Sequence, residues 1–249
     1  MHVKFDHIVI FVKHLDQAVQ FFKEHKFHVV YGGSHPMWGT YNALIYIGES
    51  YLELIAIEHE HVFKDAALQP YTLHETYAIN ERKNGYTRFA LRTDQSPVVA
   101  DILKGANYDV HGPDQFSRTT PTGDRIQWQM VHAGIEDRST TLPFFIQWSL
   151  PDDVRFNSLR EQNIIAPHPV GDIILSEVHI HEGNLQQLIA FYNVIQIPVI
   201  KEDNQLTVQI GETKVVYYSD PTTLPKIVFK NANNSNEFIF DQTVYTIKQ

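Results

Sequence analysis

The chain has 249 residues, with 29 acidic and 20 basic side chains and a formal net charge of −9 at pH 7. Because a phosphate backbone calls for a basic protein surface, this balance argues against a nucleic-acid-binding protein. The sequence contains no cysteine, which excludes disulfides, cysteine catalysis and thiolate metal sites. No apolar run approaches the ~20 residues of a membrane helix and no signal-peptide pattern opens the chain, so we expect a cytoplasmic protein without a membrane partner.

The first part of the chain predicts a unit of one strand, one helix and three further strands. Residues 3–12 are rich in Val, Ile and Phe, as is typical of a strand covered on both faces. Apolar residues then recur at helical spacing from Leu15 to Phe22. After a short strand and a loop, residues 39–58 read as two strands that turn at Gly48.

The same order of elements returns twice. YTRFALRT predicts a strand, and Ser96 ahead of a proline predicts a helix cap. Two short strands around residues 108–111 and 115–119 and a later strand, DRIQWQMVH, complete a second unit over about residues 86–133. Residues 136–172 interrupt the pattern as a connector with one strand, LPFFIQW. A third unit then covers residues 173–249, with a helix capped by Asn184.

One carboxylate, Glu53, lies inside an otherwise apolar strand. Because side chains alternate between the faces of a strand, Glu53 shares a half-buried face with Tyr51 and Ile55. A lone buried carboxylate is unfavourable without a partner, and His7, also set among apolar strand residues, is the candidate. From the pattern alone, a satisfied core pair without chemistry explains the two residues equally well.

FDHIVIFV at the start of the first unit, with GTYN and YLELIAIE at its end, resembles the vicinal oxygen chelate superfamily, and within it the glyoxalase-like branch with extra C-terminal modules. The resemblance implies an α+β fold of repeated βαβββ modules. Two modules, within residues 1–135, would pair into a half-open barrel with a cleft, and a C-terminal module would follow. It also implies that His7 and Glu53 ligate a divalent cation, Zn, Mn, Ni or Fe. A homodimer is compatible with it, since members often pair or exchange units between chains.

The second unit departs from the superfamily pattern. Arg88 falls where the first unit has His7, and the last predicted strand of the unit offers only Gln127 or Gln129 where a histidine or an acid is usual. Arginine stays protonated and does not bind metals. Either the metal binds weakly, or Arg88 replaces it by neutralising Glu53 and receiving a substrate carboxylate. The plain alternative for Arg88 is a surface residue on an edge strand.

Further polar residues gather in the loop and strand that lead to Glu53. Substrate contacts tend to lie in loops at the mouth of a cleft, so we expect some of these side chains to bind substrate. For Asn42, a turn-stabilising role is an equally good explanation. The candidates are His35, Trp38, Thr40 and Asn42.

Two functions from different classes follow. The first is a divalent-metal-dependent lyase or isomerase acting on a small oxygen-rich metabolite, with Glu53 doubling as the base in proton transfer. The second is a metal-free protein that binds or sequesters a small molecule, as bleomycin-resistance proteins do, with no cofactor and with Arg88 in place of the metal. A dioxygenase is less well supported, because its iron requires two histidines and one carboxylate and only one histidine, His7, is in place. An interaction protein built on the C-terminal unit is a third hypothesis.

Overall fold

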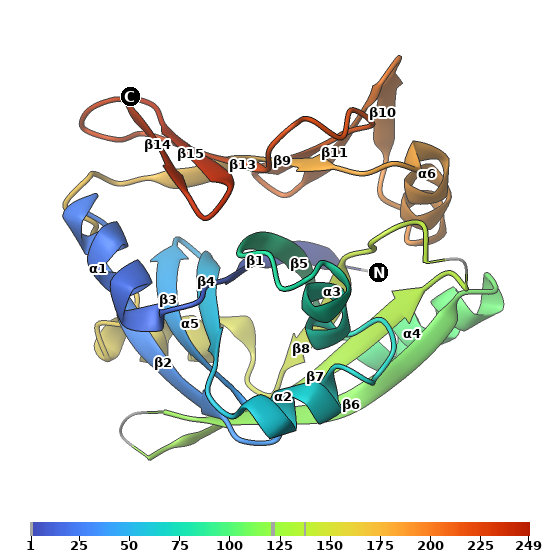
Figure 1. Cartoon of the computed structure of the whole chain (residues 1–249), viewed down its shortest axis with the longest axis horizontal. Coiled ribbons are helices and arrows are strands. Elements are labelled where there is room, and N and C mark those ends of the chain that lie inside the picture. The colour runs from blue at the N-terminus through green and yellow to red at the C-terminus, as the bar shows by residue number, and fades with distance from the viewer. Residues whose placement is uncertain (1, 121–122, 137) are drawn as a thin grey trace.

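The computed structural model describes residues 2–120, 123–136 and 138–249. Two βαβββ modules form a closed eight-stranded barrel, and the C-terminal part forms a seven-stranded sheet that lies across it (Figure 1). The expected α+β class with repeated βαβββ modules is confirmed. No helix within the described ranges is long and apolar enough to span a membrane.

The barrel is built from two modules of the same element order. The first contains β1 (Val3–Phe11), α1 (Leu15–Glu24), β2 (Val30–His35), β3 (Thr40–Ile47) and β4 (Ser50–Ile57). The second contains β5 (Gly85–Thr93), α4 (Ser96–Gly105), β6 (Asp109–Thr119), β7 (Arg125–Gly134) and β8 (Phe144–Trp148). Two short helices, α2 (Glu60–Ala66) and α3 (Leu73–Ile79), connect them, and α5 (Asp152–Glu161) follows the second module.

The barrel closes more completely than the half-open form expected from the sequence. Its strands run in the order β1, β4, β3, β2, β6, β7, β8, β5, and Ser34 of β2 pairs with Thr119 of β6 to complete the ring. β8 pairs parallel with β5 and antiparallel with β7. The strand that the sequence suggested within a connector is therefore a barrel strand, and the second module extends to Trp148.

Three local features differ from the sequence-based expectations. The segments around Tyr108 and Gln115 belong to one strand, β6, with a register shift between His111 and Asp114. Ser96 lies inside α4 and does not cap it, since its hydroxyl donates to the side chain of Gln129 on β7. The Pro-rich part of the expected connector includes α5, whose charged sequence carries few apolar residues at helical spacing.

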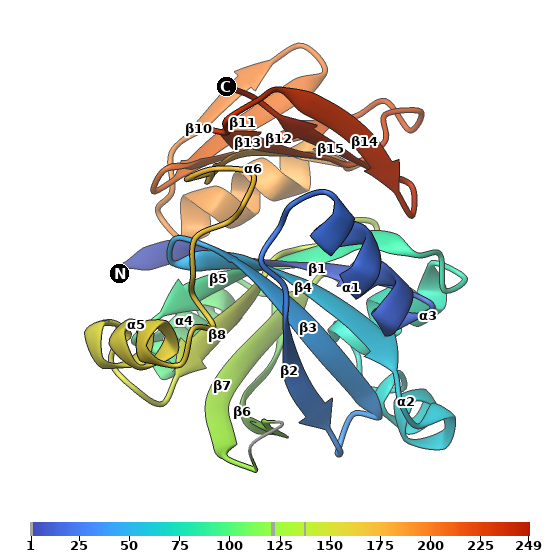
Figure 2. The ribbon, with the colours of Figure 1, turned by 90° about the vertical axis from the view of Figure 1, so that its left-hand side faces the viewer.

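The C-terminal sheet continues the pattern and then extends it. It contains β9 (Ile174–His181), α6 (Leu185–Val194), β10 (Val199–Glu202), β11 (Gln205–Ile210), β12 (Thr213–Tyr218), β13 (Lys226–Lys230), β14 (Asn236–Phe240) and β15 (Thr243–Ile247). Its order is β10, β11, β12, β9, β13, β15, β14. The sheet faces the barrel with α1 and α6 between them, as Figure 2 shows. Phe22 of α1 packs against Tyr245, and Phe191 of α6 against Phe145 of β8.

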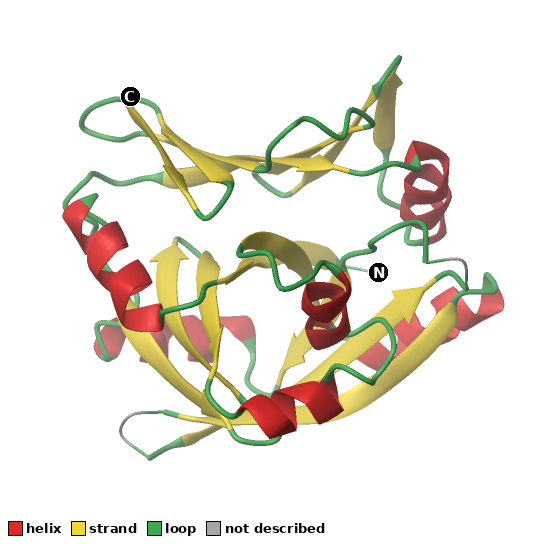
Figure 3. Ribbon diagram, in the orientation of Figure 1, coloured by secondary structure: helices red, strands yellow, loops and turns green. Residues whose placement is uncertain are grey.

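Alternation along the strands separates an inner from an outer apolar cluster. In β1, Ile8 and Ile10 join the large core between barrel and sheet, whereas Val9 and Phe11 point into the barrel. Helices cover the two ends of the interior (Figure 3). Phe156 of α5 packs at the end near the start of β4, and the α2–α3 segment covers the other end, where Tyr77 stacks on Phe11. These helices narrow both ends of the barrel interior.

Candidate active site

A cavity of about 60 Å³ lies inside the barrel. Both modules and α3 contribute to its wall, so it forms only when the two modules pair. Six of the nine residues named from the sequence line it. They are His7, His35, Trp38, Thr40, Asn42 and Glu53.

His7 and Glu53 face one another across the cavity wall. Their strands, β1 and β4, run parallel, and Glu53 pairs with Val9, two residues beyond His7. His7 Nε2 lies 3.5 Å from Glu53 Oε2, and both side chains are almost fully buried. The convergence of these two side chains, on which the functional interpretation of the sequence depends, is present in the fold.

Asp6 fixes the orientation of His7. A register shift in the pairing of β1 with β5 lets two consecutive residues, Asp6 and His7, reach interior partners, as bulges commonly do. Asp6 Oδ1 lies 2.6 Å from His7 Nδ1. Because an ionised carboxylate can only accept, Nδ1 carries a proton, and Nε2 is the nitrogen that faces the cavity and exchanges a proton there.

Asp6 is fully buried but remains ionised. Burial alone would raise its pKa, yet the hydrogen bond with His7 and the positive charges of Arg155 and Arg92 hold the pKa well below its usual value. Arg92 Nη1 and Trp148 Nε1 also donate to Asp6 Oδ2, at 3.2 and 3.1 Å. The carboxylate therefore has partners on both oxygens and cannot easily turn away from His7.

Glu53 is held from the side opposite His7. Asn42 Nδ2 donates to Glu53 Oε1 at 2.6 Å and lies 3.5 Å from His35 Nε2. His35 in turn is hydrogen-bonded through Nδ1 to the hydroxyl of Thr40, at 3.0 Å. β2 and β3 thus supply a polar network whose last member fixes the carboxylate.

Several residues of the cavity were not anticipated from the sequence. Arg118 of β6, His132 of β7 and His74 of α3 line the wall, each at most 6% exposed. Burial, with the charges of Arg118 and His74, lowers the pKa of His35 to about 3. Burial likewise lowers the pKa of His74 to about 3, and with Arg88 and other neighbours it lowers that of His132 well below normal. These histidines are therefore neutral at pH 7.

Aromatic side chains form much of the remaining wall. Trp38 stacks on Phe116 with ring centroids 4.6 Å apart and on His74 at 5.1 Å. Phe116 also lies face to face with Trp128, at 6.2 Å. Alternation along β6 and β7 would have indicated the inward direction of Phe116 and Trp128, but not that they meet in one cavity.

Arg88 does not line the cavity and has no contact with Glu53. Its Nε donates to the carbonyl of Leu142 at 3.0 Å, and its guanidinium also donates to the carbonyl of Tyr71, just before α3. The expected role of Arg88 in place of a metal is therefore not supported. Its guanidinium instead forms hydrogen bonds that connect the α2–α3 segment to the residues before β8. Arg88 is buried, which also differs from the surface alternative.

Gln127 and Gln129 point away from the cavity. Trp128 and Met130, their neighbours along β7, line it, so alternation directs both glutamines to the outer face. There Gln129 accepts from the hydroxyl of Ser96. The expectation of a substrate contact at these positions assumed that β7 was the last strand of its module, whereas β8 is.

The second module lacks the ligands that a metal between the modules would need. Glu53 pairs with Val9, two residues after His7, and in the same way Phe144 pairs with Ala90, two residues after Arg88. The counterpart of the His7–Glu53 pair is thus Arg88 stacked over the ring of Phe144, at 5.4 Å. Across the described residues, no group of three or more His, Asp or Glu side chains is arranged to hold a metal ion. Two donors fall short of the three or more protein ligands usual for zinc.

Comparisons with known proteins agree with this architecture. A family model described as a glyoxalase-like domain matches residues 5–194. A hypothetical protein from Staphylococcus aureus has a similar structure over 99% of this chain and 100% of its own, with 21% identity and a TM-score of 0.86. That likeness establishes the fold alone.

Weaker similarities extend over the barrel. A methylmalonyl-CoA epimerase from Mycobacterium tuberculosis is 17% identical over 61% of this chain and 91% of its own, with a TM-score of 0.42. One from Streptomyces coelicolor, in complex with 2-nitronate-propionyl-CoA, is 22% identical over 60% of this chain and 100% of its own, with a TM-score of 0.43. These scores are too low to support a functional argument. No curated protein matches the chain.

Proposed function

The chain belongs to the glyoxalase-like domain family, and from this premise we propose that it is an isomerase- or lyase-type enzyme that moves a proton on a small oxygen-rich metabolite. The single observation that carries the proposal is the arrangement of Asp6, His7 and Glu53 within the cavity. The donor set lacks the ligands for a divalent cation, so no step in the proposal uses one.

His7 and Glu53 would act together as the proton acceptor. His7 Nε2 and Glu53 Oε2 lie 3.5 Å apart and face the same region of the cavity, so a proton taken from a substrate there can pass to either atom. A substrate C–H bond next to a carbonyl would break there, with its electron pair moving into the carbonyl to give an enolate and its proton passing to the pair. Return of the proton to carbon gives an isomer, and loss of a neighbouring leaving group gives a lyase product.

The surroundings of the pair favour such a transfer. Asp6 keeps the imidazole in the required tautomer and stabilises it once protonated, and Asn42 leaves only one oxygen of Glu53 facing His7. His7 and Glu53 are buried, and electrostatic interactions are stronger in such a low-dielectric environment than in water. All of these groups lie within one chain, so the proposal needs no second copy.

Exchange of carbon-bound hydrogen for deuterium tests the proposal directly. Small 2-oxo and 2-hydroxy acids, together with their amides and small ketones, would be incubated with the protein in D₂O and followed by ¹H NMR. We expect protein-dependent loss of an α-proton signal for at least one compound, and a fall of about 100-fold or more in His7→Gln and Glu53→Gln. Exchange that neither variant slows would contradict the proposal, as would no exchange with any compound.

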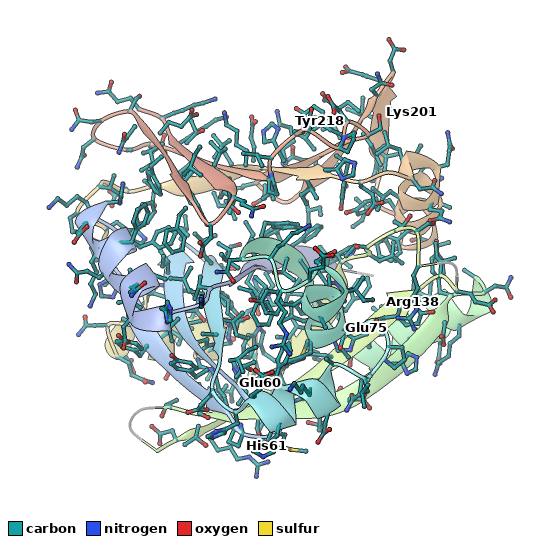
Figure 4. The ribbon with its side chains drawn as sticks, viewed as in Figure 1. Glu60, His61, Glu75, Arg138, Lys201 and Tyr218 are labelled. Carbon is teal, nitrogen blue, oxygen red and sulfur yellow. The ribbon has the colours of Figure 1, made fainter. Side chains whose placement is uncertain are left out.

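The C-terminal sheet offers a matched control. Glu177 Oε2 and His179 Nε2 lie 2.8 Å apart on β9, and neither residue lines the cavity. Tyr218, labelled in Figure 4, lies on the same sheet. Glu177→Gln and His179→Gln make the same chemical changes as the two test variants. Their exchange rates are expected to equal that of the unmodified protein.

The aromatic wall supports a second candidate, a protein that sequesters a flat small molecule without converting it. The stacked rings of Trp38, Phe116 and Trp128 could hold a planar ligand by stacking. This version does not use Arg88. It predicts ligand-induced thermal shifts that survive EDTA and weaken in Trp38→Ala, with no deuterium exchange of the bound ligand. Shifts that require a metal would contradict it.

A further inference from the structure

A buried positive charge without a partner lies in the cavity wall. The side chain of Arg118, on β6, faces the cavity, and the residue is 5% exposed. Within the described residues, nothing forms a hydrogen bond or ion pair with its guanidinium. Its nitrogens are open to the cavity, where an anion from outside the chain can pair with them.

The other buried arginines of the barrel each have polar partners within the chain, although Arg155 Nη1 and Arg92 Nε make no hydrogen bond. Arg92 pairs with the carboxylates of Asp6, Glu49 and Asp152. Arg155 donates to the hydroxyl of Tyr46 and stacks on aromatic rings. Arg88 donates to two backbone carbonyls. Arg118 alone among these four residues lacks such partners and faces the cavity.

Asn42 Oδ1 packs against the backbone of Gly32, next to Arg118. Gly32 of β2 has no side chain, and a Cβ there would lie 2.1 Å from Asn42 Oδ1 and 3.0 Å from Arg118 Nη1. Asn42 Oδ1 is buried and has no hydrogen-bond partner. The amide nitrogen of Asn42 donates to Glu53, which leaves the oxygen on the side of Gly32 and Arg118. An acceptor and a cation thus adjoin one point of the wall.

We infer that Arg118 binds the carboxylate of the substrate and that Asn42 Oδ1 accepts from a hydroxyl on it, so that the pocket takes small hydroxycarboxylic acids. This inference rests on the proposed function and names its substrate class. The carboxylate neutralises Arg118, and Asn42 lies between this site and Glu53, which separates the two negative groups. The carbon that bears the hydroxyl then faces the His7–Glu53 pair.

The size of the cavity restricts the acid further. A cavity of about 60 Å³ is smaller than the ~150 Å³ needed to enclose benzene in an engineered protein core. Acids of two to four carbons therefore fit best. Larger conjugates would require the α2–α3 segment to move.

Binding of acids and of their amides separates a carboxylate site from a general small-molecule pocket. Glycolate, lactate and 2-hydroxybutyrate would be titrated by calorimetry beside glycolamide, lactamide and 2-hydroxybutyramide. We expect at least one acid to bind at least tenfold more tightly than its amide. Arg118→Gln should lower the affinity for that acid at least tenfold and the affinity for its amide less than twofold. Arg118→Lys should retain part of the preference for the acid over the amide. Equal binding of acid and amide, or no effect of Arg118→Gln, would overturn the inference.

A surface variant controls for the change in net charge. Arg125 is the exposed first residue of β7, where it pairs with Thr119, the residue after Arg118. Arg125→Gln removes the same charge at the next position along the barrel wall. It should leave the acid affinity within twofold of the unmodified protein, and a tenfold loss there would show that overall charge, not the cavity, attracts the acid.

Stability without ligand distinguishes a binding residue from a structural one. Because Arg118 lacks a partner, Arg118→Gln should leave the melting temperature of the ligand-free protein unchanged or raise it. Arg155→Gln, which removes a partnered guanidinium, should lower it. If Arg118→Gln lowers the melting temperature as much as Arg155→Gln does, the inference is contradicted.

The two proposals can fail separately. If His7→Gln and Glu53→Gln bind hydroxy acids normally but lose exchange, both proposals hold. If acids bind through Arg118 and none exchanges deuterium, only the proton-transfer proposal fails. If exchange occurs on neutral compounds and Arg118→Gln does not slow it, only the present inference fails.

Discussion

His7 donates from Nδ1 to Asp6 across 2.6 Å, and this bond decides which nitrogen of the ring faces the cavity. In Asp6→Asn the new amide can donate to Nδ1, which would move the ring proton to Nε2 and leave His7 unable to accept a proton from substrate. We therefore expect deuterium exchange to fall about 100-fold or more, with acid affinity within threefold of normal. If the exchange rate of Asp6→Asn falls by less than threefold, Asp6 has no role in proton transfer.

Arg88 is predicted to stabilise the fold, not to bind ligand. Removal of its guanidinium in Arg88→Met leaves the carbonyls of Tyr71 and Leu142 without these donors. The free energy of unfolding should therefore fall by about 1–3 kcal/mol. Chemical denaturation measures this loss. In the protein that remains folded, the acid affinity should be unchanged. A specific loss of acid affinity at normal stability would instead place Arg88 in the binding site.

A surface ion pair at the same place serves as the comparison. Glu75 of α3 and Arg138 lie beside one another and form an ion pair (Figure 4). The Arg138 side chain is 42% exposed, and exposed pairs contribute little to stability. Arg138→Gln should therefore shift the denaturation midpoint much less than Arg88→Met does.

Acid should destabilise the protein through its buried histidines. The pKa values of His35 and His74 are lowered to about 3, and that of His132 also lies well below its usual value. Below pH ~6.5 the unfolded chain binds protons that the folded chain does not, so stability falls as the pH falls toward 3. Each such histidine contributes a slope of up to about 1.4 kcal/mol per pH unit.

Denaturation curves between pH 7 and pH 4 measure this slope. His74→Phe keeps an aromatic ring next to Trp38 and removes one titrating group, so its stability should depend less steeply on pH. A slope identical to that of the unmodified protein would show that His74 is protonated in the folded state.

Local patterns in the sequence were sufficient for the first half of the site. The inward direction of Glu53 follows from alternation along one strand, and His7 lies in a strand whose composition indicates burial. Both could be named before their distance was known. His35, Trp38, Thr40 and Asn42 were found for a similar reason, since they directly precede the strand of Glu53.

The second half of the site depends on contacts that no local pattern reports. Arg118 lies in a strand that the sequence suggested as two short pieces, and its place beside Gly32 depends on the pairing of β2 with β6 that closes the barrel. Phe144 lies in a strand that was expected in a connector, so its correspondence with Glu53 was hidden. The role of Asp6 depends on the register shift beside His7, which places two consecutive residues in the interior.

The most direct test of the account is the deuterium-exchange rate of metal-depleted protein. After dialysis against EDTA, with elemental analysis to verify removal of Zn, Mn, Ni and Fe, the rate on the best hydroxy acid should equal that of untreated protein, because His7 and Glu53 alone receive the proton. A rate that is lost on depletion and restored by one of these cations would contradict the account and would make His7 and Glu53 metal ligands.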